Sequence, residues 1–456
     1  MHARSFRRPG LLINRSFVLL WAGQTVSVLG DTLFDTTLVL WITTRLAAGQ
    51  PWSPLAVAGV LFAATLPVLV VGPLAGVYAD RWDKRRTLLR MDAVRALLIA
   101  LLLPIALDMP LALLPRDGLP LIWRLGAIYG VVLLAAACAQ FFFPAQIALL
   151  AAIVDEAHLA QASGLTRISQ GAAQVAGPGL AAVLYFAAGP AWALAINAAS
   201  FGVSFLAVAA MRGIVTEWAG ETGNSRERGS VWRELWAGLR FFFGHRTLRG
   251  LLVAAVIVLL GAGTLNTLDI FFVTQNLAAP ASLFGLLGTA LGLGLIAGSA
   301  LAAALASRIG VGRTFWLGLV AGGLVIIAYA RQTQVVPALA LIALSGATIG
   351  AVNVAISPLL LHLTPRDMIG RVAAVFNPIT SLATLASIAL AGYLDGVTLR
   401  GFHQQVFGLR IGPVDTIYTA TGLLILLGGL YARRILRGVR LKGEPGATAQ
   451  EPPTNP

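Results

Sequence analysis

Charged residues are scarce in this chain of 456 residues. Asp, Glu, Lys and Arg make up 11% of it, whereas hydrophobic residues make up 57%. A soluble domain carries roughly a quarter charged residues, so this composition excludes an ordinary soluble protein. Several apolar runs are long enough to cross about 30 Å of hydrocarbon as helices. The sequence therefore predicts a protein that crosses a membrane many times.

Cysteine, histidine and lysine are also rare. The single cysteine, Cys138, lies inside an apolar run, which excludes a disulfide framework and a cysteine-based metal site. The five histidines are scattered and form no HExxH pair. Neither of the two lysines, Lys84 and Lys442, follows a GxxxxG loop that could bind nucleotide phosphates. We therefore predict no catalytic residue, no metal site and no cofactor.

The apolar runs, bounded by charge, Gly or Pro, predict twelve membrane helices. They cover residues 17–43, 55–79, 88–107, 122–150, 163–188, 190–211, 249–273, 283–306, 314–330, 335–361, 372–394 and 413–435. The first run is too long for the core of a signal peptide and contains acids, so we predict a membrane helix there. The predicted fold is an all-α integral membrane protein with two pseudo-symmetric six-helix bundles.

The long hydrophilic segment 212–248 separates the two predicted bundles. The predicted domains are an N-terminus (1–16), a first bundle (17–211), this central loop, a second bundle (249–435) and a disordered tail (436–456). Within the central loop, apolar residues recur at helical spacing, at Trp232, Leu235, Trp236, Leu239, Phe242 and Phe243. This pattern predicts an amphipathic helix on the membrane surface, with a partner-binding helix as the alternative.

Basic residues are concentrated on one side of the predicted helices. Of the 33 Lys and Arg residues, 26 lie on the side of the termini, in the loops or at the adjoining helix ends, 6 lie likewise on the other side, and Arg95 lies deeper inside the third helix. By the positive-inside rule, both termini are expected to be cytoplasmic. The net charge of +14 comes from cations in loops between apolar runs, so we expect no nucleic-acid partner.

Two acids in the first predicted helix are candidates for a proton or substrate site. Asp31 lies about 14 residues after Phe17, or ~21 Å along a helix, near the middle of the membrane. Asp35 follows four residues later on the same side. A carboxylate at this depth costs several kcal/mol unless it faces a cavity, is paired or is protonated. The alternative is a structural acid held by neighbouring hydroxyls or an arginine.

Other polar residues lie inside predicted helices. Asn266 and Asp269 occupy the corresponding part of the second half, so both are candidates for the same site. Asp269 lies close to the outer end, where solvent exposure is the alternative. Asp92 and Arg95, three residues apart, predict a structural ion pair within one helix.

A dense charged loop follows the second predicted helix. Its pattern Gly76-x-x-x-Asp80-Arg81-x-x-Lys84-Arg85-Arg86 resembles the loop between helices two and three of the major facilitator superfamily. The resemblance extends over the twelve helices, the two halves and the long central loop. Together with Asn14-Arg15-Ser16-Phe17, the loop looks like the branch that holds macrolide-efflux and siderophore-export carriers. The superfamily usually has glycine where this chain has Asp83.

The resemblance implies a gating role for this loop, carried by Gly76, Asp80, Arg81, Arg85 and Arg86. The alternative is that the cations only fix the topology and bind lipid headgroups. A weaker copy of the loop lies 227 positions later, where Ser307 replaces the acid and Gly310 keeps the glycine.

Gly177 and Pro178 in the fifth predicted helix resemble the antiporter motif of the same superfamily, although alanine replaces several of its usual glycines. The pair implies a helix hinge, because proline removes a backbone hydrogen bond. The arginine motif that the superfamily has in helix four is not matched.

These features together predict a secondary active transporter rather than an enzyme. We expect a proton-coupled exporter, an antiporter that moves amphipathic organic compounds such as macrolide-like drugs by alternating access. A dedicated siderophore or metabolite exporter and a nutrient importer are the alternatives. The expected partners are a small lipophilic substrate, protons and membrane lipids, and the expected form is a monomer in a bacterial inner membrane.

Overall fold

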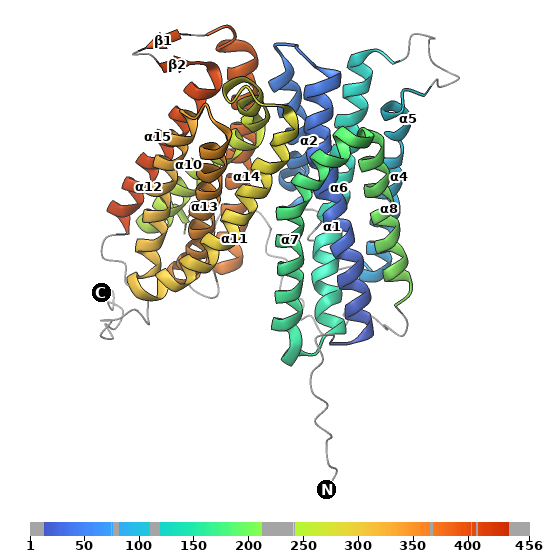
Figure 1. The fold of residues 1–456 in the computed structure, drawn as a ribbon. Coiled ribbons are helices and arrows are strands. Elements are labelled where there is room, and N and C mark those ends of the chain that lie inside the picture. The colour runs from blue at the N-terminus through green and yellow to red at the C-terminus, as the bar shows by residue number, and fades with distance from the viewer. Residues whose placement is uncertain are drawn as a thin grey trace, which may run out of the picture. The chain divides into compact units, whose positions relative to one another are not determined.

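The computed structural model describes residues 13–73, 75, 82–109, 119–211, 240, 242–364, 368–402, 404–406 and 409–436. Nearly all of the described residues are helical (Figure 1). The helices are α1 (Arg15–Trp41), α2 (Ser53–Val70), α4 (Lys84–Ala100), α5 (Leu103–Ala106), α6 (Leu121–Ile153), α7 (Glu156–Ala188), α8 (Pro190–Ala209), α10 (Arg246–Phe271), α11 (Phe284–Ile309), α12 (Val311–Ala330), α13 (Val335–Leu363), α14 (Ile369–Tyr393) and α15 (Pro413–Ile435). Three π-helical turns, Ile42–Leu46, Phe272–Asn276 and Leu394–Thr398, extend α1, α10 and α14, and a 3₁₀ turn, Ala281–Leu283, precedes α11.

A short hairpin that the sequence did not predict precedes α15. Strand β1 (Gln404–Val406) pairs antiparallel with β2 (Leu409–Ile411). Three-residue strands are too short to show a period of two, so the sequence pattern gives no signal for them.

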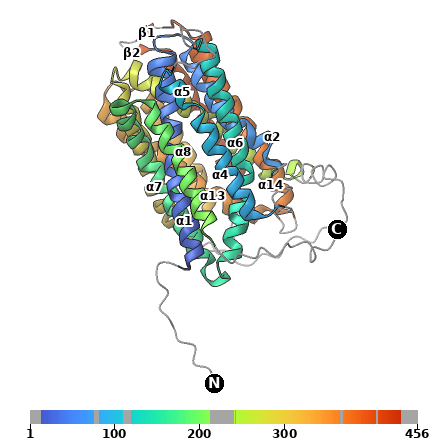
Figure 2. The ribbon, with the colours of Figure 1, turned by 90° about the vertical axis from the view of Figure 1, so that its right-hand side faces the viewer.

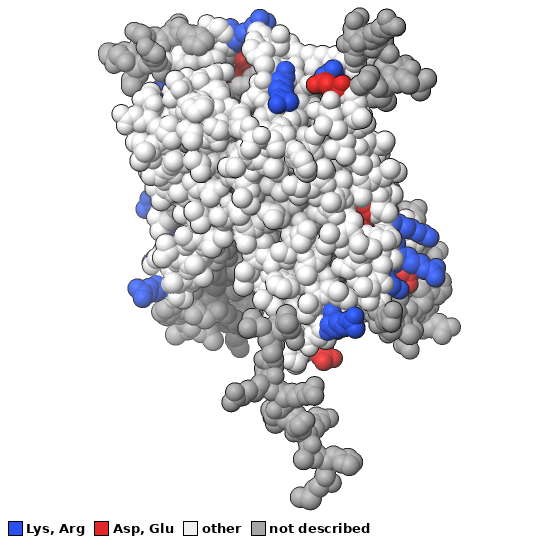
Figure 3. All heavy atoms as spheres, turned by 45° about the vertical axis from the view of Figure 1, so that its right-hand side comes forward, with Lys and Arg blue, Asp and Glu red and all other residues white. Residues whose placement is uncertain are grey.

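Among the described residues, eleven helical segments are long and apolar enough to cross a membrane. On the face drawn in Figure 3, charged side chains gather near the ends of the helices, and the broad band between them is almost free of charge. The predicted third helix, 88–107, is not continuous, because α4 ends at Ala100 and the short α5 follows. Pro104 has no N–H to donate to the carbonyl of Ala100, which explains the end of the regular helix.

The start of α1 is fixed by a side-chain cap. The Oδ1 atom of Asn14 accepts a hydrogen bond of 2.7 Å from the backbone N–H of Phe17, and its Nδ2 donates to the carbonyl of Ile153 at 2.6 Å. An N-cap asparagine satisfies an N–H group that has no partner within the helix. The same side chain ties the start of α1 to the end of α6.

The described chain divides into two compact units. Unit 1 comprises residues 1–41 and 63–224, and unit 2 comprises residues 42–62 and 225–456. The first part of α2 thus belongs to unit 2. There, a Cβ atom added at Gly392 of α14 would meet the side chain of Ala58 and lie 3.0 Å from the carbonyl oxygen of Pro54. Only glycine allows this close approach of two helices.

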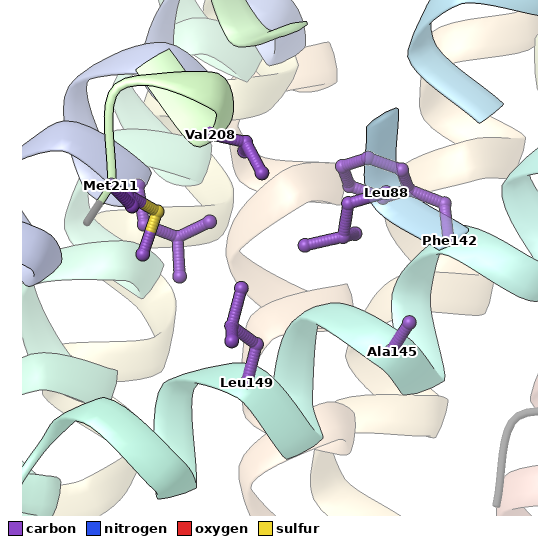
Figure 4. Packing of buried hydrophobic residues seen from close by; sticks show 7 residues of the cluster. Leu88, Phe142, Ala145, Leu149, Val208 and Met211 are labelled. Atoms are coloured by element: carbon purple, nitrogen blue, oxygen red, sulfur yellow. The ribbon is translucent and has the colours of Figure 1, made fainter. Parts of the chain in front are cut away.

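In unit 1, α1 packs against α7 and α8, and α4 packs against α6 and α8 (Figure 2). A cluster of apolar side chains from α1, α4, α6 and the end of α8 fills the space between these helices (Figure 4). Leu88, Phe142 and Leu149 are at most 1% exposed. This packing fixes α4, which carries the only ion pair buried among the described residues.

In unit 2, helices α11 and α13 approach each other to backbone contact. Gly294 and Gly298 of α11 face the backbone of α13, and Gly346 and Gly350 of α13 face the backbone of α11. A Cβ atom added at Gly350 would lie 2.8 Å from the backbone nitrogen of Ser299. Two interleaved Gly-x-x-x-Gly pairs therefore hold these helices at backbone contact.

The core of unit 2 also contains a residue that we expected elsewhere. Phe242, predicted on the apolar face of a membrane-surface helix, is fully buried with Leu248, Leu252 and Phe376. For Phe242 the surface prediction is wrong, because α10 and α14 provide an apolar site for its ring. Phe243 is 47% exposed, and the other residues of the predicted amphipathic face, Trp232 to Leu239, lie outside the described residues.

Asp83 and Gly310, the equivalent positions of the two loop copies, begin α4 and α12 in different ways. Asp83 has φ −60°, and its side chain accepts a hydrogen bond from the backbone N–H of Arg86 at 2.7 Å. Gly310 has φ 90° and ψ 152° and no side chain to cap the helix. Such a backbone conformation is open only to glycine. The aspartate in the first copy thus occupies a position where glycine is not required.

Candidate functional site

One face of α1 combines polar and aromatic side chains. Trp21, Thr25, Val28, Thr32 and Asp35 recur at intervals of four and three residues, which places them on one side of the helix. The side chain of Asp35 is exposed. Because a carboxylate facing hydrocarbon is costly, this face of α1 must line a space that water can enter.

The side chain of Asp31 lies in a different environment from that of Asp35. It is half-buried, its polar neighbour is Asn197 on α8, and Arg95 and Asp92 on α4 lie within electrostatic range. The nearby hydroxyl of Thr32 donates instead to the carbonyl of Leu29, at 2.8 Å. Of the structural alternatives for Asp31, an arginine is thus within electrostatic range, whereas the hydroxyl of Thr32 does not donate to this carboxylate.

Near Asp31, a buried hydrogen-bond network connects helices α1, α4 and α8. Arg95 Nη2 lies 2.6 Å from Asp92 Oδ1, which confirms the predicted ion pair. Ser204 Oγ donates to Asp92 Oδ2 at 2.6 Å, and Gln24 Nε2 donates to Ser204 Oγ at 2.8 Å. Each member of this network is at most 7% exposed.

Two aromatic rings enclose the guanidinium group of Arg95. Its Cζ atom lies 4.3 Å from the ring centre of Phe142 and 4.3 Å from that of Phe201. A cation over the faces of aromatic rings is stabilised by their quadrupoles. The rings and Asp92 together offset the removal of this cation from water.

A polar recess lies nearer to the start of α1, between α1, α6 and α7. It has room for about 10 Å³, and nine residues line it: Trp21, Gln24, Thr25, Val28, Phe143, Gln146, Thr166, Ser169 and Gln170. The indole Nε1 of Trp21 donates to Ser169 Oγ at 2.9 Å, which closes one wall. Sequence reasoning overlooked Gln146 and Gln170, although uncharged amides inside membrane-length helices were a usable signal.

Gly177 and Pro178 lie inside α7, which runs without a break from Glu156 to Ala188. A Cβ atom at Gly177 would overlap the side chain of Thr32 on α1. The glycine is thus explained by close packing of α7 on α1, and the hinge stays a prediction.

In unit 2, the structure separates the two predicted site residues of α10. Asn266 is exposed, whereas Asp269 is 8% exposed. The hydroxyls of Tyr418 and Tyr329, both fully buried, donate to Asp269 Oδ1 at 2.6 and 3.2 Å. The ring of Phe272 packs against both tyrosines. Asp269 is therefore not exposed to solvent, and its carboxylate is held by neutral donors.

Of the predicted gating loop, Gly76, Asp80 and Arg81 lie outside the described residues. Arg85 donates from Nη2 to the carbonyl of Ala209 at 2.7 Å and from Nε to that of Val208 at 3.2 Å. These carbonyls end α8, where a cation is favourable for the helix dipole. Arg86 is exposed. Arg85 therefore ties α4 to α8, a structural contact that the loop motif did not reveal.

Comparisons with known proteins agree with this picture of a membrane protein. Residues 10–401 match a protein family described as "Transmembrane secretion effector". The "Uncharacterized MFS-type transporter YkuC" of Bacillus subtilis (strain 168) is 24% identical over 426 residues, 91% of this chain and 90% of that protein. "Macrolide efflux protein A" of Streptococcus pyogenes is 25% identical over 169 residues, 37% of this chain and 38% of that protein.

Solved structures share the fold. A bacterial homologue of the iron transporter ferroportin in an inward-facing state has a TM-score of 0.70 at 14% identity, with 92% of this chain and 98% of that chain covered. The nucleoside transporter NupG has a TM-score of 0.67 at 13% identity, with 92% and 99% covered. The superfamily to which these relatives point consists of transporters, not enzymes. This chain is therefore a membrane transporter of the major facilitator superfamily and belongs to its family of transmembrane secretion effectors.

Proposed function

We propose that this chain is a proton-coupled exporter of amphipathic organic compounds that works by alternating access. The observation that carries the proposal is the carboxylate pair of α1: Asp35 is exposed on a polar helix face, and Asp31 lies within electrostatic range of it. Two acids so placed can bind protons, or a cationic group of a substrate, at a depth where either must leave bulk water.

The direction and the kind of substrate rest on separate arguments. The family description speaks of secretion, and the matched Streptococcus pyogenes protein is named for macrolide efflux. Charged side chains are few inside the membrane-length helices, which favours a lipophilic compound over a sugar or an inorganic ion. A siderophore or metabolite exporter and a nutrient importer are the alternatives.

The proposal includes twelve membrane helices, with both termini in the cytoplasm of a bacterial cell. The twelfth is α4 followed by α5, and α4 differs from the other eleven because it is only 17 residues long and carries a cluster of charged residues that includes Asp92 and Arg95. The excess of Lys and Arg in the termini and in the loops on their side supports this orientation. In bacteria this membrane is the inner or only cell membrane.

Transport by purified protein in liposomes with an imposed pH gradient tests the proposal. We expect the gradient to drive uptake of a lipophilic cation or a macrolide into the vesicles through the wild-type protein. Asp31→Asn and Asp35→Asn should each reduce this dependence on the gradient at least tenfold. Asp155→Asn, the same chemical change at an exposed residue between α6 and α7, is the matched control and should transport like the wild type. Equal transport with and without the gradient in all four proteins would refute proton coupling.

A further inference from the structure

The recess between α1, α6 and α7 is lined by hydrogen-bonding groups without charge. No Asp, Glu, Lys or Arg is among the described residues that line it. Three of its residues are glutamines, three carry hydroxyl groups, and Trp21 and Phe143 add aromatic rings. Such a lining differs from the carboxylates of Asp31 and Asp35, so any ligand it holds must be recognised without charge.

The glutamines of the recess differ in whether their carboxamides have partners. Gln24 donates to Ser204 and so belongs to the buried network. Gln146 and Gln170 make no hydrogen bond with any other residue that the structure describes. Each carboxamide offers two donors and an acceptor, and leaving them unsatisfied inside a membrane protein costs free energy. Water or a ligand must therefore supply these bonds.

The hydroxyl groups beside these amides are arranged to accept. Thr25 Oγ1 donates to the carbonyl of Trp21 at 2.8 Å, and Thr166 Oγ1 donates to that of Ala162 at 3.0 Å. Their protons are used within their own helices, so lone pairs remain toward the recess. Donors and acceptors thus line the same small space, which matches a hydroxyl group or, through the amide donors, a carbonyl.

The dimensions decide how much of a ligand can enter. A room of about 10 Å³ holds one group of the size of water, so the rest of the ligand must lie outside, against the ring of Phe143, which is 47% exposed. Thr25 in the recess and Asp35 are ten residues apart on one face of α1, or ~15 Å. An elongated compound with a cationic group and an oxygen-rich part suits this separation.

We propose that the recess between α1, α6 and α7 binds a hydroxyl or carbonyl group on a neutral, oxygen-rich part of the transported compound. Gln146 and Gln170 form the hydrogen bonds, and the rings of Trp21 and Phe143 contact the apolar face of the same part. This inference rests on the proposed function and specifies which substrates use the recess: compounds with both a cationic group and a neutral polyoxygenated region.

Equilibrium binding of two probes to the purified full-length protein tests the inference. Erythromycin carries an amine and many hydroxyl and carbonyl groups, whereas tetraphenylphosphonium is a lipophilic cation without hydrogen-bonding groups. We expect Gln146→Leu and Gln170→Leu each to weaken erythromycin binding by about three- to tenfold, the effect of one lost hydrogen bond, and to leave tetraphenylphosphonium binding unchanged. Gln170→Asn, which keeps the amide but shortens it, should give a smaller loss.

Gln161→Leu is the matched control, because Gln161 is exposed on the same helix and does not line the recess. It should bind both probes like the wild type. Unchanged erythromycin binding in the Gln146 and Gln170 variants would mean that only water occupies the recess and would overturn the inference. An equal loss of both probes, or an equal loss in Gln161→Leu, would also overturn it. Wild-type protein that binds only tetraphenylphosphonium would refute the inference alone, whereas failure to bind either probe would count against the proposed substrate class itself.

Discussion

The two units bury polar groups in different ways. In unit 1, the ion pair of Asp92 and Arg95 lies between α4, α6 and α8, with Ser204 and two aromatic rings around it. In unit 2, Asp269 has no cation beside it among the described residues and is held by two tyrosine hydroxyls. A buried carboxylate is thus paired with a cation in unit 1, whereas in unit 2 a buried carboxylate accepts hydrogen bonds from neutral hydroxyl groups.

The units also differ in which polar side chains remain accessible. In unit 1, the carboxylate of Asp35 is exposed, and the glutamines Gln146 of α6 and Gln170 of α7 line an open recess. In unit 2, the acids that the structure describes, Asp269, Asp395 and Asp415, are all buried, and exposed helical residues near the corresponding positions, such as Asn266, are neutral. Ion-dependent steps are therefore expected to depend on unit 1.

The largest effect is expected when the ion pair of unit 1 is broken. Arg95→Leu or Asp92→Leu leaves an unpaired buried charge, and each should lower the free energy of unfolding by about 3–5 kcal/mol. The double variant should lose less than the sum of the two, because no charge remains unpaired. Thermal unfolding in detergent measures both. If the double variant lost as much as the sum, the pair would not be a coupled unit, and the contrast with unit 2 would disappear.

The stability of unit 2 should be most sensitive to substitution of the glycines between α11 and α13. Gly346→Val inserts two methyl groups and a methine against the backbone of α11 and should cost about 1–3 kcal/mol or more. Gly202→Val on α8 of unit 1 is the control, because no other atom lies within 4 Å of a Cβ atom added there. It should stay within about 0.5 kcal/mol of the wild type. Equal losses in both variants would contradict the view that backbone contact makes Gly346 of α13 intolerant of a side chain.

The two tyrosines that donate to Asp269 should differ in how much they stabilise the protein, and the shorter hydrogen bond should contribute more. Tyr418→Phe removes the 2.6 Å hydrogen bond and Tyr329→Phe the 3.2 Å one. A buried acceptor that loses its hydrogen-bond donor costs about 1–3 kcal/mol, so Tyr418→Phe, which removes the shorter bond, should be the more destabilising change. Both remain smaller than the loss of Arg95, because a neutral donor rather than a charge is removed. The apparent unfolding temperature gives the order, and a larger effect of Tyr329→Phe would contradict the geometry.

The last comparison concerns the two helix starts, Asp83 and Gly310, and the smallest expected effect is that at Asp83. Asp83→Ala removes the cap of α4 and should cost about 1 kcal/mol, whereas Asp83→Gly should cost only a few tenths. Gly310→Ala places a side chain in a backbone conformation open only to glycine, at about 1–3 kcal/mol. Asp155→Ala at the start of α7, where no side-chain cap is formed, controls for the loss of charge. Equal tolerance of alanine at both loop positions would show that the two copies are interchangeable.

Much of the fold could be predicted from the sequence, because apolar runs of membrane length permit little except helices. The run 413–435 was predicted to the residue as α15. The third helix was predicted too long, because an apolar count does not register the missing N–H of Pro104. The hairpin β1–β2 was not predicted, because strands of three residues are too short to show an alternating pattern.

The sites were less predictable. Spacing alone predicted that Asp31 and Asp35 lie on the same side of α1. Packing against α4 and α8 determines that Asp31 lies near Arg95 and Asn197, whereas Asp35 is exposed. Nothing in the sequence near Asp269 indicates the tyrosines that hold it, since they lie 60 and 149 residues away.

By itself, the sequence determined that this protein lies in a membrane as apolar helices, that its charges gather in the loops, and that Asp92 and Arg95 pair within one turn. These follow from composition and from local spacing, which act before any packing. Only the tertiary structure decided which polar groups are buried together and which remain open. Contacts between distant helices form Asp269's tyrosine shell and the recess of Gln146 and Gln170, because in a helix bundle the neighbours of a side chain come mostly from other parts of the chain.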